Sequence, residues 1–87
     1  MRLTQTAQFK KDLKNQVKKG KDLEKVLEVI RILMEGRELP EKYRDHPLRG
    51  RWTNRRDCHL EPDWILIYKI TLEELRLERT GTHSDLF

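Results

Sequence analysis

The chain has 87 residues, of which 39% are charged and 36% hydrophobic, and its formal net charge is +4. This length predicts a single domain over residues 1–87, because two independent cores need more chain. The sequence contains no apolar run near the roughly 18 residues that cross a bilayer, and no stretch of signal-peptide type at its N-terminus. A lone cysteine excludes an internal disulfide framework and a cysteine-cluster zinc site. Together these features favour a cytosolic protein.

Residues 1–36 predict a short strand followed by two amphipathic helices. The strand covers residues 2–5, and Thr6 can cap a helix whose apolar side chains recur every four positions. A second helix follows Asp22 and ends near Gly36, where glycine is a typical stop. The two apolar stripes consist of Phe9, Leu13 and Val17, and of Leu23, Val26, Leu27, Ile30, Leu33 and Met34. The short connection at Gly20 predicts an antiparallel helix hairpin.

The second half of the chain predicts a loop and then a set of strands. Residues 40–50 contain two prolines and predict a loop, followed by short strands over residues 51–55 and 57–60. The apolar, β-branched run 64–70 predicts a central strand, and a turn separates it from a last strand over residues 75–81. Short connections between these strands imply antiparallel pairing. The predicted fold is α+β, with the helix hairpin on one face of a small antiparallel sheet.

Charge is divided unevenly between the two halves. Residues 1–44 carry twelve basic and seven acidic side chains, whereas residues 45–87 carry seven and eight and hold all three histidines. Lys10, Lys14 and Lys18 line one face of the first helix, which is either a solvated face or an RNA-docking face. Four arginines crowd one short stretch as a phosphate-binding strip or as the charged face of an edge hairpin: Arg49, Arg51, Arg55 and Arg56.

The three histidines are the residues best suited to chemistry. His46, His59 and His83 lie at loops or strand ends, where a rigid sheet can present them to a ligand. A metal-free ribonuclease needs a base to take the proton of a 2′-hydroxyl and an acid to protonate the leaving 5′-oxygen. Histidine suits both roles because its ordinary pKa is about 6.5. A lone loop histidine is, however, more often a solvated surface residue.

Other side chains fit the same chemistry, and each also has a structural interpretation. Arginine offers a fixed fork of N–H groups to phosphoryl oxygens, and Arg56 is a candidate for binding the substrate. Trp64 or Phe87 can stack on an unpaired base, although Trp64 opens the most apolar strand and equally suits the core. Cys58 has no evident activating motif, which favours a buried or half-buried thiol.

A metal site is the competing chemical interpretation. His59, Glu61 and Asp63 alternate along the chain, so a regular strand would place all three on one side. Pro62 interrupts that strand, and no helical histidine pair supports the site. We therefore expect neither a metal nor another cofactor.

Several segments in the right order closely resemble the YafQ branch of the RelE/ParE toxin superfamily. The resemblance covers nearly the whole chain and rests on residues 9–13, 45–48, 56–68, 78–83 and 86–87. It implies a RelE-like fold and the toxin of a type II toxin–antitoxin module. Such toxins are mRNA interferases that enter the ribosomal A site and cut messenger RNA without a metal. It also implies a DinJ- or RelB-like antitoxin that silences the toxin, with operator DNA bound only by the antitoxin complex.

The resemblance also implies roles for individual residues. The acid/base and site-shaping positions are held by His46, His59, Asp63 and His83, and Arg79 stands at the phosphate-stabilising position. Trp64 and Phe87 stand where the family contacts or orients its substrate. His83 is the expected general acid. His46 or His59 would act as the base or orient the RNA, and Asp63 would set a histidine tautomer or act in proton transfer.

A non-enzymatic binding module is the alternative from a different class. It would be a ParE-like gyrase inhibitor or a DNA-binding co-repressor. The ParE branch shares the fold but lacks this histidine-rich set, so three histidines with Arg79 favour the nuclease.

Overall fold

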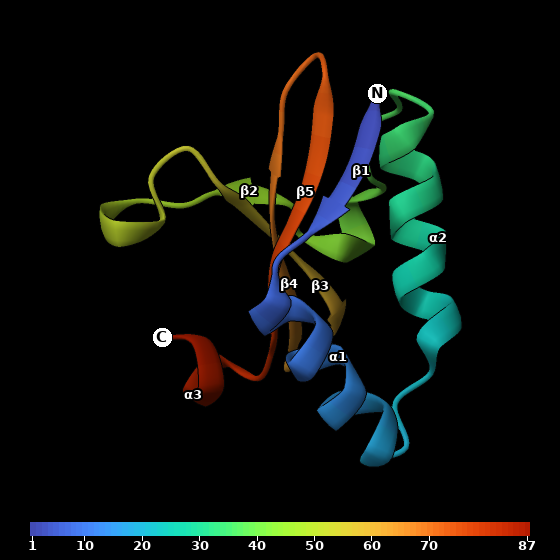
Figure 1. The fold of residues 1–87 in the computed structure, drawn as a ribbon, viewed down its shortest axis with the longest axis vertical. Helices are drawn as coiled ribbons and strands as arrows, with labels where there is room; N and C mark the ends of the chain where they lie inside the picture. Colours follow the sequence, from blue (N-terminus) through green and yellow to red (C-terminus); the bar gives the residue numbers. More distant parts are fainter.

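The computed structural model describes residues 1–87 and consists of one five-stranded sheet with two long N-terminal helices and a short C-terminal helix (Figure 1). The elements in chain order are β1 (Arg2–Gln5), α1 (Ala7–Lys18), α2 (Leu23–Met34), β2 (His46–Pro47), β3 (Arg56–Glu61), β4 (Trp64–Ile70), β5 (Glu74–Gly81) and α3 (His83–Leu86). Short 3-10 helices cover Glu41–Tyr43 and Gly50–Trp52. The strands are arranged β1-β5-β4-β3-β2 across the sheet. The predicted α+β class, with two N-terminal helices before the main strands, is confirmed.

Local capping explains where both long helices begin and end. The Thr6 hydroxyl accepts a hydrogen bond from the Phe9 N–H at 2.9 Å, and the Asp22 carboxylate accepts one from the Glu24 N–H at 2.9 Å. Each cap satisfies a backbone donor that the first helical turn leaves without a partner. Gly36 follows α2 with a φ of +73°, a left-handed conformation that favours glycine. The predicted caps and stop are confirmed.

The main core lies between the helices and one face of the sheet. Thirteen buried side chains form it, including Phe9 from α1, Val29 from α2, and Leu66 and Leu75 from the central strands. Full burial of each such side chain contributes about 1.5–3 kcal/mol. A smaller cluster on the opposite face contains Ile65, Ile67 and Leu86. Because only α3 and the segment before β3 reach that second face, β3 and its neighbours can present polar side chains there.

The buried face of α1 differs from the predicted apolar stripe. Phe9 is buried, but Val17 at the end of the stripe keeps 43% of its surface exposed. Asp12 and Gln16 are buried instead. The helix is rotated in this way because Asp12 bonds to β5.

The sheet is mixed rather than antiparallel, which corrects one prediction. Strands β3 to β5 pair antiparallel as expected, and the unpredicted β2 pairs antiparallel with β3, but β1 lies parallel to β5, with Leu3 opposite Leu75. Short connections favour antiparallel pairing only between strands that they join directly. The whole chain from α1 to β4 separates β1 from β5, so that argument does not apply to this pair.

Two local predictions are also wrong. The strand expected over residues 51–55 is a 3-10 helix and a turn, and Gly50 and Asn54 have left-handed φ values of +66° and +70°, which a regular strand does not contain. The loop expected over residues 40–50 includes a 3-10 helix and the two residues of β2. The last residues, for which the sequence predicts no helix or strand, form α3, which begins with a reciprocal capping box between Thr82 and Asp85.

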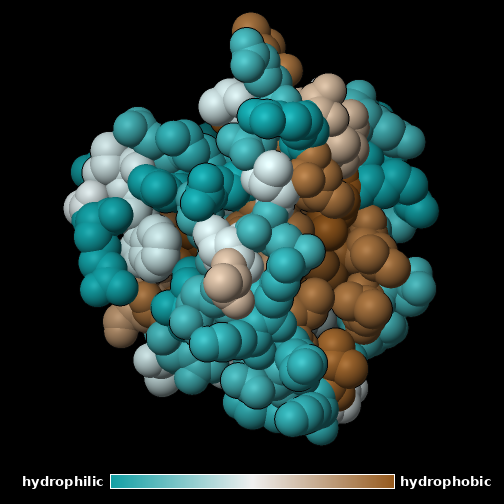
Figure 2. Space-filling view, viewed as in Figure 1, coloured by the Kyte–Doolittle hydropathy of each residue, from teal (hydrophilic) through white to brown (hydrophobic).

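Exposed apolar side chains gather on the side of the molecule where α2 lies beside β1 (Figure 2). Leu3, Leu23 and Leu27 each keep at least 40% of their surface exposed. They line a cavity of about 270 Å³ together with Phe9 and Ile30. None of the helices has both the length and the apolar character needed to cross a membrane.

Candidate active site

Strand register brings the predicted polar residues onto neighbouring positions of the sheet. His46 of β2 pairs with Asp57 of β3, Asp57 with Ile67 of β4, and Ile67 with Arg79 of β5. His59 lies two residues after Asp57 on β3 and pairs with Ile65. Since side chains two residues apart on a strand share a face, Asp57 and His59 point to the same side. That side is the one opposite the long helices.

The three imidazoles converge at this face. The ring centroid of His59 lies 6.5 Å from that of His46 and 5.8 Å from that of His83. Phe87 continues the row, with its ring 5.7 Å from the His83 ring and 58% of its surface exposed. The structure thus groups His46, His59, His83 and Phe87, which the sequence separates by up to 41 positions.

Backbone carbonyls fix the tautomers of two histidines. Nδ1 of His46 lies 2.9 Å from the Arg44 carbonyl oxygen, and Nδ1 of His59 lies 3.1 Å from that of Pro62. A carbonyl oxygen only accepts, so Nδ1 carries the hydrogen in both rings. In the neutral form Nε2 of each ring then carries a free lone pair. Both residues are thereby prepared to accept a proton at Nε2.

Asp63 connects the β3–β4 turn to the start of α3. Its Oδ1 accepts a hydrogen bond from the His83 backbone N–H at 2.9 Å and lies 3.5 Å from His83 Nδ1. Both residues are more than half exposed. This arrangement places the His83 ring beside the other two and gives Nδ1 a carboxylate neighbour.

Asp57, which the sequence did not single out as a site residue, lies beside the His46 ring. Asp57 keeps only 2% of its surface exposed, and its Oδ1 lies 3.1 Å from His46 Nδ1 without forming a hydrogen bond. Burial raises the pKa of the Asp57 carboxyl, while positive charge on His46, His59 and His83 would lower it. The signal in the sequence was its spacing of two residues from His59, which places both on one face of β3.

Arg79 is held by Asp12 of α1. Its guanidinium donates to Asp12 through Nε at 2.7 Å and Nη2 at 3.2 Å. These bonds to Asp12 raise the pKa of Arg79 above its ordinary value. Its Nη1 makes no hydrogen bond in the structure, so one end of the fork stays free.

The structure does not place Arg56 or Trp64 with the histidines. Arg56 lies one position before Asp57, so it points to the opposite face and donates to Asp45 at 3.2 Å. Trp64 is fully buried in the main core, where its indole N–H donates to Thr80 at 2.9 Å. Trp64 has no exposed face, whereas the Arg56 side chain keeps 38% of its surface exposed but lies on the other face of the sheet. The substrate contacts expected of both residues stay predictions. Core packing is the interpretation of Trp64 that fits.

The remaining candidates are distributed around the cluster. Arg49 and Arg51 are exposed and line a shallow cavity with Phe87, whereas Arg55 is paired with Glu78 at 3.0 Å. The lysines of α1 are exposed.

Glu61 does not share a face with His59, because a bulge in β3 between these two residues breaks the alternation that a shared metal site needed. Glu61 instead pairs with Lys21 at 2.6 Å and with Lys25 at 2.8 Å. Cys58 is buried, as predicted.

Known proteins resemble the chain over its whole length. The profile of the family described as "Bacterial toxin of type II toxin-antitoxin system, YafQ" matches residues 1–87. The chain is 49% identical over 83 residues to the mRNA interferase toxin YafQ of Escherichia coli K12, covering 94% of this chain and 90% of that protein.

Solved structures agree with this match. A crystal structure of the E. coli DinJ–YafQ complex contains a chain that is 47% identical to this one and superimposes on it with a TM-score of 0.93. The match covers 100% of this chain and 99% of that chain. A metal-bound toxin from Helicobacter pylori is 42% identical with the same TM-score and coverage. This chain therefore belongs to the YafQ family of bacterial toxins from type II toxin–antitoxin systems.

Proposed function

We propose that this protein is a ribosome-dependent mRNA endoribonuclease and the toxin of a type II toxin–antitoxin pair. The observation that carries the proposal is the convergence of His46, His59 and His83 on one face of the sheet, with ring centroids about 6 Å apart. The 49% identity to an mRNA interferase toxin supports the same activity. An acid and a base placed together in this way each contribute roughly 10²- to 10⁴-fold to the rate.

The reaction is an intramolecular phosphoryl transfer. The base removes the proton of an RNA 2′-hydroxyl, and the resulting oxygen attacks the adjacent phosphorus. The P–O5′ bond breaks, and the leaving 5′-oxygen takes a proton from the acid. The products are a 2′,3′-cyclic phosphate and a free 5′-hydroxyl, so protons and charge balance without an added reagent.

The geometry supports a division of roles among the histidines. His46 and His59 carry their hydrogen on Nδ1, so Nε2 of either can act as the base. His83 acts as the acid from the opposite end of the row, with Asp63 beside its Nδ1. Arg79 can offer its free Nη1 to the phosphoryl oxygens while Asp12 holds the rest of the guanidinium. Phe87 can hold a base next to His83 by stacking.

Macromolecular partners follow from this activity. The substrate is mRNA in the ribosomal A site, which makes the cytoplasm the place of action. A cognate antitoxin of the DinJ or RelB type would silence the toxin, and operator DNA would be bound only through that complex. Solved complexes of relatives with DinJ support an antitoxin partner. The exposed apolar side chains beside α2 offer the kind of surface that protein partners cover.

Primer extension on a translated message tests the proposal. Wild-type protein should produce new 5′ ends in the message only when ribosomes translate it, and His83→Ala should abolish the cuts while circular dichroism shows an intact fold. His46→Ala and His59→Ala should each reduce cutting. Leu72→Ala is the control, because Leu72 is 98% exposed at the β4–β5 turn. Full cutting by His83→Ala would refute its assignment, and an uncut message with wild type would refute the nuclease itself.

A further inference from the structure

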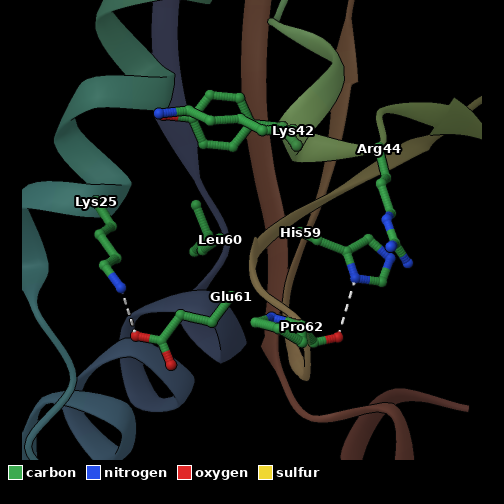
Figure 3. Close-up of a pocket in the computed structure, with 8 residues that line it drawn as sticks. Lys25, Lys42, Arg44, His59, Leu60, Glu61 and Pro62 are labelled. Carbon is green, nitrogen blue, oxygen red and sulfur yellow. Dashed lines mark hydrogen bonds and ion pairs between the residues drawn. The ribbon is translucent and has the colours of Figure 1, made fainter.

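A pocket lies beside the histidine cluster, and His59 forms part of its wall. It has a volume of about 360 Å³ and its eight lining residues are Lys25, Lys42, Tyr43, Arg44, His59, Leu60, Glu61 and Pro62. Figure 3 shows the Arg44 side chain extending from its loop toward the His59 ring, with Pro62 below. His59 therefore faces this pocket and also lies 5.8 Å from His83 in the cluster. A chain bound at the histidines would reach this pocket next.

The charge in the pocket is not distributed evenly. Lys25 is neutralised by Glu61, whose Oε2 accepts a hydrogen bond from Lys25 Nζ at 2.8 Å. The Arg44 guanidinium forms no ion pair and no hydrogen bond, and Lys42 contacts only the Tyr43 ring, 5.1 Å from its centroid. By contrast, Asp12 already holds Arg79. Arg44 is therefore the unpaired guanidinium on the His59 side of the cluster.

The backbone of Arg44 is held in an unusual conformation. Its φ of +49° lies in the left-handed region, which side chains other than glycine seldom adopt. Its N–H donates to the Glu41 carbonyl at 2.9 Å, and its carbonyl accepts from His46 Nδ1 at 2.9 Å. The Arg44 backbone, which any residue at this position retains, thus fixes the orientation of a candidate catalytic ring. Backbone strain of this kind persists where the surrounding structure enforces it, commonly at ligand sites.

We propose that Arg44, with Lys42 as a second cation, binds the phosphate of the mRNA nucleotide next to the scissile one. The inference rests on the proposed nuclease function and deepens it. A guanidinium without a carboxylate partner presents its full fork of donors, which matches two phosphate oxygens. Leu60 and Pro62 give the pocket an apolar side where the sugar and base of that nucleotide can lie. Arg44 is a substrate-positioning residue that contacts the RNA away from the reacting atoms.

Single-turnover cleavage on ribosomes carrying one defined message tests this subsite. The maximal rate and the toxin concentration that gives half of it are measured separately, at several salt concentrations. Arg44→Gln should raise the half-saturating concentration about tenfold, as expected for removing one charged hydrogen-bond donor, and leave the maximal rate unchanged. The slope of log affinity against log salt should become shallower by about 0.7, because the variant neutralises one phosphate fewer. Lys42→Gln should change both quantities in the same direction by less, and Arg44→Lys should restore part of the affinity.

Two further variants control for structure and for charge. Arg44→Gly keeps the left-handed backbone without strain and deletes the guanidinium, so it should bind as weakly as Arg44→Gln although its fold is at least as stable. Arg2→Gln removes the same charge from β1 at the opposite edge of the sheet and should match wild type. If Arg44→Gln and Arg44→Gly match Arg2→Gln in half-saturation and salt slope while wild type cleaves, the subsite is refuted alone. If wild type cleaves no message, the proposed function fails and the subsite fails with it.

Discussion

Asp12 of α1 accepts two hydrogen bonds from the Arg79 guanidinium of β5, at 2.7 and 3.2 Å, and a third from the Thr80 backbone N–H at 3.2 Å. Asp12 is buried, so these three bonds and a fourth from the Gln8 side-chain amide at 2.9 Å replace the water that its charge would otherwise require. The bonds fasten the first helix to the end of the strand that leads into α3 and His83. One buried carboxylate thus links the packing of α1 to the position of the candidate general acid.

Asp12→Ala should destabilise the protein by about 1–3 kcal/mol, because it leaves the Thr80 N–H and a partly buried guanidinium without an acceptor. Arg79→Ala should cost a similar amount, because it leaves the buried Asp12 carboxylate without its positively charged partner. The double variant should cost less than the two single effects added together, since neither group is then left alone. Urea unfolding monitored by tryptophan fluorescence measures all three free energies.

A matched control is the exposed ion pair between Arg37 and Glu35, 2.6 Å apart. Arg37→Ala should change the free energy of unfolding by less than about 0.5 kcal/mol, as is usual for solvated pairs. If Asp12→Ala proved as mild as Arg37→Ala, the bonds to β5 would not stabilise the fold.

Asp57→Asn should stabilise the fold at pH 7, by about 1 kcal/mol, and slow cleavage by about 10- to 100-fold. The carboxylate is buried without a hydrogen bond to Oδ1, and an amide of the same shape carries no charge to desolvate. The slower cleavage follows because His46 loses the charge beside its Nδ1. Thermal melts and single-turnover cleavage of the same preparations check the two halves of this prediction.

The pH dependence of stability gives Asp57→Asn a separate test. The folded-state pKa of Asp57 is raised, so between its unfolded and folded pKa values the folded protein binds more protons than the unfolded chain. Wild-type stability should therefore decline as pH rises through this window, and Asp57→Asn should remove that part of the slope. Glu61→Gln is a control of opposite sign. Bonds to Lys21 and Lys25 lower the pKa of Glu61, so the stability that Glu61 contributes is lost as pH falls rather than as it rises. An Asp57→Asn protein with an unchanged slope would contradict the prediction.

The sequence predicted those features that depend on neighbouring residues. Thr6 and Asp22 cap their own helices within three residues, and the apolar run of β4 identifies a central strand wherever it packs. The convergence of the histidines followed from the family resemblance, since spacing alone does not place His83 beside His59. The turn at Gly50 and Asn54 was missed because several residue types at 51–55 favour strands, and left-handed backbone angles at two positions override that preference.

Features set by distant pairings could not be predicted. Asp12 and Arg79 are 67 residues apart, so neither the burial of Asp12 nor the neutralisation of Arg79 has a local signal. Asp57 is buried, and its neighbour across the sheet is His46 of β2, a strand only two residues long that the sequence did not predict. Arg44 looked like one basic residue in a loop, and its importance depends on the backbone bond to His46 and on the bulge that leaves His59 facing a pocket.

The thiol of Cys58 should be inert in the folded protein. It is fully buried on β3, and burial raises the pKa of the thiol well above its ordinary value, so almost no thiolate exists at neutral pH. Ellman's reagent should label one thiol per chain in 6 M guanidinium chloride and none on the same timescale in buffer. Labelling in buffer should occur only at the rate of unfolding, and destabilised Asp12→Ala should label faster than Arg37→Ala. Rapid labelling of the native wild type would contradict the burial.

Metal removal should leave the nuclease active, because imidazole donors and acceptors alone supply the proton transfers. The toxin is incubated with a chelator and desalted before it meets ribosomes, since ribosomes themselves need Mg²⁺. Its single-turnover rate should equal that of untreated toxin, and added Zn²⁺ should inhibit, because a metal would occupy the Nε2 lone pairs that the base requires. The metal-bound relative from H. pylori makes the comparison informative.

Added Mg²⁺ is the control cation, since it prefers oxygen ligands and should not compete for imidazole. A stripped protein that lost cleavage and regained it with Zn²⁺ would instead assign the histidines to a metal, and the acid–base roles proposed for His46, His59 and His83 would have to be abandoned.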